Sequence, residues 1–407
     1  MIDRRWAKPT ALAFSLSLST LACSEETQAP QGCTPGVDCE TPVEESPATT
    51  QPQDLQTCRL SRLFITTSDY TRGGLALLDR ASGSSEVATE PNADQDSAPF
   101  EANCQALLLE RSEGRLRFMQ RNAPFATEKL VEFDPPGATG SYLSNPQKVV
   151  RRADGKLYVV LLQRNELLLL DPAAAPETPP TSIDLSPLHD ARDLDGVVDA
   201  NDAVAIGDRL YIALGRYHFD SSFTPRFLAG SVIAVVDMSS QSLVDMDAAT
   251  PGIQGIDLQG ENPWRGLRPN VEGSALWVGS TGRIGPQDGG IESIDLASGQ
   301  STGFVLREDQ VGGEIQAFEP VNSERLWLVV DGKLQAWNPS SKTAIGEVLM
   351  QNVEGIYVID NELYAWSRSG TGAGLRRFSL DEGVETTPNA APWTFGTLPI
   401  YGVAAVP

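Results

Sequence analysis

The chain has 407 residues, 41% of them hydrophobic and 7% aromatic, which is too much apolar material for one ordinary compact core. Its formal net charge of −23 repels phosphate backbones, so nucleic acid is excluded as an expected partner. With 36 glycines and 28 prolines, turns should be frequent.

The N-terminus carries the pattern of an export signal. Arg4, Arg5 and Lys8 form a basic start, and a short apolar run ends in small residues at Ala22. The run is too short to remain as a membrane-spanning helix. We therefore expect residues 1–22 to be a signal peptide that is removed on export.

The residues at the expected cleavage position resemble the lipobox of bacterial lipoproteins. Leu21 and Ala22 precede Cys23, and in that family this cysteine is diacylated before the signal peptide is cut away. The resemblance implies palmitate or similar chains on Cys23, and Ser24 after it implies an outer-membrane address. Several chains would hold the protein on a membrane, because one chain alone binds weakly. Ordinary signal cleavage beside an incidental cysteine is the alternative.

The segment after the lipobox looks like a spacer. Residues 23–56 are rich in Glu, Thr, Pro, Gln and Ser and have almost no large apolar side chain, so we expect a disordered tether. Four more cysteines follow Cys23, an even number in an oxidising compartment. We expect a local Cys33–Cys39 disulfide and a Cys58–Cys104 disulfide between the first two repeats, although spacing alone does not fix the pairing.

One pattern recurs through residues 57–407. GGLALLDRASG begins at Gly73 and GGIESIDLASG at Gly289, and both read as a turn, an apolar strand, an Asp and a small polar turn. Each of seven such copies follows a second strand at a spacing of about 50 residues. These second strands are centred on Leu63, Leu116, Leu157, Leu210, Leu276, Leu326 and Leu363. Four-stranded units at this period predict an all-β, seven-bladed β-propeller of antiparallel blades.

The two ends of the repeat region complement each other. The first repeat lacks an inner strand, while Ile400–Val406 reads as an inner strand with no blade after it. We expect this last strand to complete blade one and close the ring without an open edge. An open solenoid is the alternative, but it needs polar capping repeats that the sequence does not show.

The repeats resemble a known family. GKLYVV…NELLLLD and DRLYIAL…GSVIAVVD resemble the seven-bladed propellers with YVTN-type repeats, and the likeness covers residues 57–407. The second pair, with its Asp-rich sequence upstream, is similar to secreted propeller lipoproteins of unassigned function. The resemblance implies the fold but no activity, because propellers include binders, lactonases, quinoproteins and scaffolds.

The long insertions of the repeats fall on one face, and two of them surround blade four. GRYHFDSSFTPRFLAG supplies the candidate ligand-face residues Arg216, Tyr217, His218 and Phe219. HDARDLDGVVDAND echoes a calcium loop, although Ala191 stands where an Asp is required. A loose Ca²⁺ site and a solvated acidic loop are both compatible with this pattern. The candidate calcium ligands are Asp193, Asp195, Asp199, Asp202 and Asp220.

The expected inner strands begin with polar residues that should ring the mouth of the central channel. They are Asn103, Asn145, Asp202, Asn262, Glu314 and Glu354. Lactonase-type propellers hold Ca²⁺ in such a ring, so a calcium-dependent, lactonase-like hydrolase is one alternative and a polar, water-filled channel is another.

No catalytic motif accompanies these residues, since the nucleophile elbow, HExxH, P-loop and dinucleotide fingerprints are all missing from the sequence. No catalytic residue is therefore assigned. We expect a monomeric cell-envelope lipoprotein that binds a protein, a glycan or a small molecule without catalysis.

Overall fold

The computed structural model describes residues 58–407 except for short gaps at 89–91, 136, 141, 176–177, 220–224, 229, 284–285, 371 and 388–390. The expected signal peptide, Cys23, the Cys33–Cys39 pair and the tether lie outside these residues. Strands dominate the described part, which has only a 3-10 turn at Ser186–Leu188 and the short helix α1 at Glu308–Val311. A search of the described residues for a helix long and apolar enough to cross a membrane finds none.

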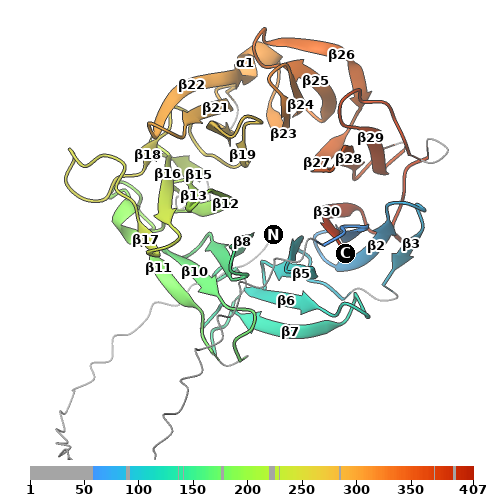
Figure 1. Cartoon of the computed structure of the whole chain (residues 1–407), viewed down its shortest axis with the longest axis horizontal. Coiled ribbons are helices and arrows are strands. Elements are labelled where there is room, and N and C mark those ends of the chain that lie inside the picture. The colour runs from blue at the N-terminus through green and yellow to red at the C-terminus, as the bar shows by residue number, and fades with distance from the viewer. Residues whose placement is uncertain are drawn as a thin grey trace, which may run out of the picture. The chain divides into compact units, whose positions relative to one another are not determined.

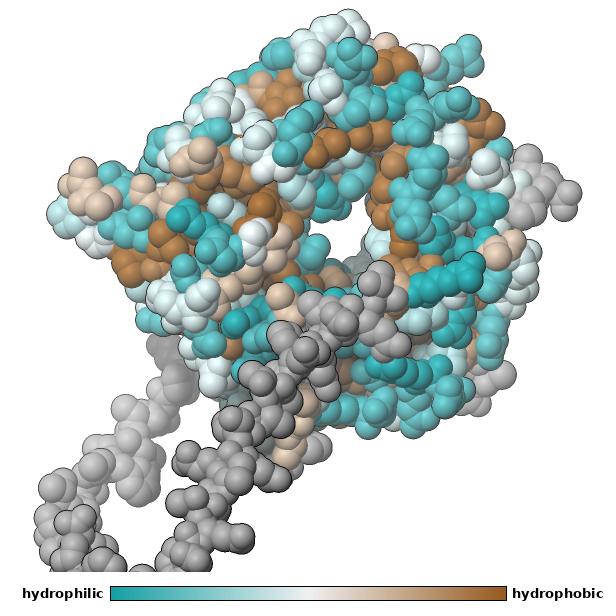
Figure 2. Space-filling model, viewed as in Figure 1, coloured by the Kyte–Doolittle hydropathy of each residue, from teal (hydrophilic) through white to brown (hydrophobic). Residues whose placement is uncertain are grey.

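Antiparallel sheets form seven blades around a central channel (Figure 1), and the space-filling view shows the channel as an opening through the ring (Figure 2). From the channel outward, blade one consists of β30 (Ile400–Val406), β1 (Arg62–Ser68), β2 (Gly73–Asp79) and β3 (Ser85–Val87). Blade two consists of β4 (Ser97–Ala102), β5 (Gln105–Glu110), β6 (Arg115–Met119) and β7 (Thr127–Glu132). Blade three consists of β8 (Pro146–Arg151), β9 (Leu157–Leu161), β10 (Glu166–Leu170) and β11 (Thr181–Asp184).

Blade four is the most elaborated. It consists of β12 (Ala200–Ile206), β13 (Arg209–Leu214), β16 (Val232–Asp237) and β17 (Ser242–Leu243), and β18 (Ile256–Asp257) also pairs with β16. Between β13 and β16, the chain forms an extra hairpin of β14 (Tyr217–Phe219) and β15 (Pro225–Phe227).

The last three blades return to the simpler pattern. Blade five consists of β19 (Leu267–Pro269), β20 (Ala275–Ser280), β21 (Gly290–Asp295) and β22 (Gln300–Arg307). Blade six consists of β23 (Ile315–Asn322), β24 (Arg325–Val330), β25 (Lys333–Asn338) and β26 (Thr343–Met350). Blade seven consists of β27 (Val353–Ile359), β28 (Glu362–Ser367) and β29 (Gly374–Ser379), with isolated bridges from β29 to Glu385 and Trp393 in the outer position. The predicted all-β, seven-bladed propeller is confirmed.

The middle strands of the blades are apolar on both faces because each blade packs between two neighbours. All five residues of β9, Leu157–Leu161, are buried, for example. Tyr158 and Val160 pack toward blade four, whereas Leu157, Val159 and Leu161 pack toward blade two. The core is therefore a series of hydrophobic layers between blades.

The C-terminal strand closes the ring as predicted. β30 pairs antiparallel with β1, and the register runs from Arg62 opposite Val406 to Thr67 opposite Ile400. Val403 and Ala405 of β30 pack with Tyr364 and Trp366 of blade seven. A disulfide between Cys58 and Cys104 adds a covalent link between blades one and two.

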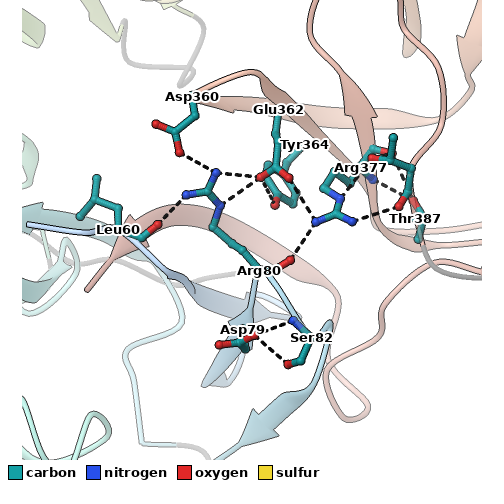
Figure 3. Close-up of polar contacts among 10 residues, drawn as sticks. Leu60, Asp79, Arg80, Ser82, Asp360, Glu362, Tyr364, Arg377 and Thr387 are labelled. Carbon is teal, nitrogen blue, oxygen red and sulfur yellow. Dashed lines mark hydrogen bonds and ion pairs between the residues drawn. The ribbon is translucent and has the colours of Figure 1, made fainter.

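A charged network joins blade seven to blade one (Figure 3). Arg80, in the turn after β2, donates to Glu362 Oε2 at 2.8 and 3.0 Å and to Asp360 Oδ2 at 2.8 Å. Arg377 of β29 donates to Glu362 Oε1 at 3.1 Å and to the Arg80 carbonyl at 2.8 Å. Tyr364 also donates to Glu362, at 2.8 Å. We call Arg80, Asp360, Glu362, Tyr364 and Arg377 the seam network.

Blade two corrects one part of the sequence analysis. The element around Leu116 was predicted as a second strand, but it is the third strand, β6, and the second is β5. Asn103 and Cys104 form a tight β4–β5 turn with φ of 55° and 61°. Such a two-residue turn is usually marked by glycine, and this one is not. Asn103 is therefore in a hairpin turn, bonded to Gly155 and Arg151 of blade three, and not at the start of an inner strand.

Candidate functional site

Strand order sorts the connections of a blade onto two faces. The connections from second to third strand and from blade to blade emerge together, and the remaining turns emerge at the opposite ends of the strands. We call these the loop face and the turn face. The β14–β15 hairpin and the segment between β11 and β12 both belong to the loop face of blade four.

A repeated backbone hydrogen bond marks the start of the inner strands on the loop face. In each case the amide after the second strand donates to a carbonyl at 2.9–3.1 Å; the acceptor directly precedes the inner strand except in blade five, where Asn262 lies five residues before β19. In blades two to six these acceptors are Asp96, Asn145, Asp199, Asn262 and Glu314. We call these five residues the mouth ring. In blade one, Pro399 takes the same place and accepts from Ser68.

Some side chains of the mouth ring have hydrogen-bond or ion-pair partners, and one has none for its oxygen. Asp96 Oδ1 accepts from Tyr401 Oη at 2.7 Å and from Arg111 Nη1 at 2.8 Å. Glu314 forms an ion pair with Arg265. Asn262 is buried, and its Oδ1 has no partner among the described residues. The mouth ring thus contains paired carboxylates at Asp96 and Glu314 and an unpaired hydrogen-bond acceptor at Asn262.

The structure places the predicted channel residues unevenly. Asn145, Asn262 and Glu314 belong to the mouth ring, whereas Asp96 takes the place expected of Asn103. Glu354 is exposed at the second position of β27, where the ladder is bulged. Equivalent bulges lie at the second residue of four other inner strands, at Gln147, Asn201, Gln316 and Tyr401. A bulge re-aims its side chain, and sequence periodicity does not reveal it.

Asp202 was predicted both as a calcium ligand and as a channel residue, and its contacts are those of a structural carboxylate. Lys148 Nζ lies 3.0 Å from its Oδ1, and the Leu267 amide donates to Oδ2 at 2.9 Å. Burial raises the pKa of Asp202, but Lys148 and Arg268 together hold it below its ordinary value. Arg268 also donates to Glu319 at 2.7 Å. These charges tie together the inner strands of blades three to six.

The two blade-four insertions meet through buried polar side chains. His218 Nδ1 of β14 lies 3.0 Å from Asp193 Oδ1, and the Tyr217 amide donates to Asp199 Oδ2 at 2.8 Å. The exposed fractions are 3% for Asp193, 1% for Asp199 and 9% for His218. Asp193 Oδ2 is buried with no partner among the described residues. We call Asp193, Asp199 and His218 the blade-four cluster.

Burial dominates the electrostatics of this cluster. It raises the pKa of Asp199 to about 8, and the neighbouring carboxylates of Asp195 and Asp193 act in the same direction. Burial also raises the pKa of Asp193, opposed by its contact with His218. Asp199 therefore holds a proton at neutral pH and can donate a hydrogen bond, as a carboxylate cannot.

The remaining predicted ligand-face residues have structural contacts. Arg216 donates to the carbonyls of Gly230 and Leu188, each at 2.7 Å, and so fixes the hairpin to the neighbouring insertion. Tyr217 is buried and lies 6.2 Å from Trp264, measured between ring centroids. The side chain of Phe219 and the whole of Asp220 lie outside the described residues.

The structure describes four of the five predicted calcium ligands. Among the described His, Cys, Asp and Glu residues, no three are placed to hold a metal ion, and Asp220 is not described. Asp195 accepts from the Val197 amide at 3.0 Å, which shapes its own turn. Of the five predicted ligands, the structure brings Asp193 and Asp199 together in the blade-four cluster.

An aromatic group on the loop face was missed by sequence reasoning. The Arg368 guanidinium lies 4.3 Å from the Tyr70 ring and 5.5 Å from the Tyr401 ring, which meet edge to face at 5.9 Å. Tyr70 is 61% exposed. A cavity of about 160 Å³ adjoins Arg368 and is lined by residues 394–400. In the sequence, Tyr70 stands in a polar turn and Tyr401 near the start of the closing strand. Neither residue belongs to a motif that would have predicted this contact.

The chain is a seven-bladed β-propeller. A scan against protein-family models and a search of curated proteins find no match. Among solved structures, Citrobacter koseri AztD aligns at 12% identity with a TM-score of 0.47, over 85% of this chain and 98% of that one. A catalytically inactive virginiamycin B lyase from Staphylococcus aureus, solved with quinupristin, aligns at 12% identity with a TM-score of 0.49. The alignment covers 75% of this chain and 92% of that one. At these values the fold assignment rests on the strand pairing of this propeller itself, and the alignments assign no activity.

Proposed function

We propose that the protein is a cell-envelope lipoprotein whose propeller binds a ligand on its loop face without catalysing a reaction. The observation that carries this proposal is the unused hydrogen-bonding capacity buried there. Asp193 Oδ2, both amide atoms of Asn201 and Asn262 Oδ1 are buried without partners among the described residues. Unpaired buried polar atoms cost about 1–3 kcal/mol each, so a polar ligand that reaches them through a local opening of the loop-face insertions would bind favourably.

The surroundings favour a hydroxyl-rich ligand. Tyr70 and Trp264 expose aromatic surface on the loop face, which also carries the carboxylate and amide groups of the mouth ring. Aromatic rings pack against apolar sugar faces, while amides and carboxylates bond hydroxyls. A glycan therefore fits better than an anionic ligand, and protein and small-molecule ligands are outcomes that the same test distinguishes.

Binding of envelope glycans to the full chain, measured on a glycan array and then by calorimetry, tests the proposal. Tyr70→Ala and Asn262→Ala should each weaken binding about tenfold, because each removes about 1.4 kcal/mol of contact. Val271→Ala is the matched control, since Val271 is exposed in the β19–β20 turn on the turn face. The proposal is wrong if no glycan, protein or small ligand binds, or if the loop-face variants bind as tightly as the control.

The membrane anchor rests on the lipobox resemblance at Cys23, and we propose attachment to the outer membrane. Cys23→Ala should move the protein from the membrane pellet to the soluble fraction after detergent-free washing, because the acyl chains supply the anchoring energy. Cys33→Ala is the matched control and should leave the distribution unchanged. Retention of the Cys23→Ala chain in the pellet contradicts the anchor.

A calcium-dependent, lactonase-like hydrolase is the second candidate. It is favoured by one observation, the burial of the Asp193 and Asp199 carboxyl groups in the same insertion, with Asp193 in contact with His218. Metal analysis before and after chelation, followed by a panel of lactones and esters, separates the candidates. One bound Ca²⁺ and turnover that chelation abolishes would establish the enzyme. If the protein contains no metal and shows no turnover, the enzyme candidate is excluded.

A further inference from the structure

A cavity on the turn face lies where blades one and two meet. It has a volume of about 350 Å³, within the range of small-molecule sites. The Cys58–Cys104 disulfide forms part of its wall, together with the end of β30 and the start of β5. The cavity is at the opposite ends of the strands from the mouth ring, so it is separate from the loop-face site proposed above.

The charges of this cavity contrast with those of the chain. Its wall contains Arg59, Arg62 and Arg121 but no Asp or Glu side chain, in a protein with a net charge of −23. Arg62 Nε donates to the Pro407 oxygen at 2.6 Å, and Arg121 Nη2 donates to the Asn103 carbonyl at 3.0 Å. Neither Arg59 nor Arg121 forms an ion pair with a described carboxylate, whereas Arg80, Arg111 and Arg115 on the same two blades all do. The guanidinium groups of Arg59 and Arg121 can therefore bind an anion.

The rest of the wall is largely apolar. Leu77, Ala106, Pro124 and Val406 line the cavity between the arginines. Guanidinium groups match the geometry of carboxylates and bind them through paired hydrogen bonds. Apolar walls beside such groups suit a ligand with a hydrocarbon body.

We propose that this arginine pocket binds a small organic anion, a carboxylate attached to an apolar body. Arg59 and Arg121 hold the carboxylate, and Leu77, Ala106 and Val406 contact the hydrocarbon. The strong negative charge elsewhere on the chain directs an anion to this place, because other surfaces repel it.

Calorimetry with three ligands of equal chain length tests the charge requirement. The protein is the full chain carrying Cys23→Ala, so that detergent can be omitted, and the ligands are octanoate, 1-octanol and octylammonium. Octanoate should bind at least about tenfold more tightly than the other two, since a charge-assisted hydrogen bond contributes about 1.5–3 kcal/mol. Its affinity should fall as salt is raised. Equal binding of octanol, or no binding of octanoate, overturns the proposal.

Two sets of variants place the ligand in the pocket. Arg59→Gln with Arg121→Gln should weaken octanoate binding at least about tenfold. Arg72→Gln with Arg283→Gln removes the same charge from two exposed arginines that pair with acids elsewhere, and should leave binding unchanged. Ala106→Phe fills the cavity without changing charge and should also abolish binding. Thermal melting checks that each variant folds. If a folded pocket variant binds octanoate as the control does, the assignment is wrong.

Discussion

Two regions of the ring hold their carboxyl groups in opposite ways. In the seam network, Glu362 is shared by Arg80, Arg377 and Tyr364, so its charge is surrounded by donors. In the blade-four cluster, Asp193 and Asp199 are more deeply buried, and no arginine or lysine forms an ion pair with either in the part of the chain that the structure describes. The first arrangement fixes one blade to the next, whereas the second leaves carboxyl groups with raised pKa values.

The difference separates structure from function. Paired charges between blades are consistent with a role in closing the ring, because each has its partner already. Buried carboxyl groups without cationic partners cost stability when ionised, and groups with perturbed pKa values gather at functional sites. We therefore expect variants of the seam network to change the stability of the protein. Variants of the blade-four cluster should change how that stability depends on pH.

The largest effect should follow from deleting residues 399–407. The deletion removes β30 and exposes the edge of β1, together with apolar surface of blade seven. The loss should exceed about 5 kcal/mol, comparable with the whole stability of an ordinary domain. Urea denaturation measures it. Tyr401→Phe is the control, because it removes only the hydroxyl group, with its hydrogen bonds to Asp96 and Arg111, and should cost about 1 kcal/mol. Unchanged stability of the deleted chain would contradict ring closure by β30.

Asp199→Asn should change the pH dependence of stability. The pKa of Asp199 is about 8 in the folded protein and close to 4 in the unfolded chain, so between these values only the unfolded chain loses the proton. Stability of the parent protein therefore falls as pH rises from 4 to 8, by a few kcal/mol. The variant should lack this loss and be the more stable protein at pH 8.

Urea denaturation at pH 4, 6 and 8, with chelator present, measures this difference. Asp208→Asn is the matched control, because Asp208 is exposed in the β12–β13 turn at the other end of the same blade. If the stability of the Asp199→Asn protein declines with pH as steeply as that of the parent, the burial of a protonated Asp199 is refuted.

Arg80→Ala tests the seam network. Glu362 and Asp360 lose their shared partner, and the partly buried Glu362 is left with Arg377 and Tyr364. We expect a loss of about 2 kcal/mol, less than for a fully buried pair because Asp360 is exposed. The comparison is Arg72→Ala, which breaks the exposed pair with Asp69 and should cost at most about 0.5 kcal/mol. Equal losses would mean that the seam contributes no more than a surface pair.

Leu194→Ser should have the smallest effect on stability. Leu194 lies in the blade-four insertion and is 81% exposed, so its replacement should change the free energy of unfolding by less than about 0.5 kcal/mol. Leu188→Ser, in the same insertion but buried, should cost several times more. A large loss for Leu194→Ser would show that this residue supports the fold and is not free to contact a ligand.

Alternating apolar strands and Asp-marked turns were sufficient to predict the blades, because both follow from local chemistry. The second blade was misassigned because its tight turn is Asn103–Cys104 and lacks the expected glycine. The mouth ring was recovered only in part, since Asp96 and Asp199 are identified by backbone hydrogen bonds and not by a motif. The contact of Arg368 with Tyr70 joins residues about 300 positions apart, which no local pattern can predict.

Closure of the ring also has a kinetic consequence. Arg62 and Pro407 are hydrogen-bonded across 345 residues of sequence. Blade one therefore cannot be completed until β30, at the end of the chain, has been synthesised. Topologies with such long-range pairings fold slowly, because much chain entropy is lost before the contacts form. Until then β1 presents an uncovered ladder that other strands can pair with. This architecture therefore requires protection of β1 from aggregation during synthesis.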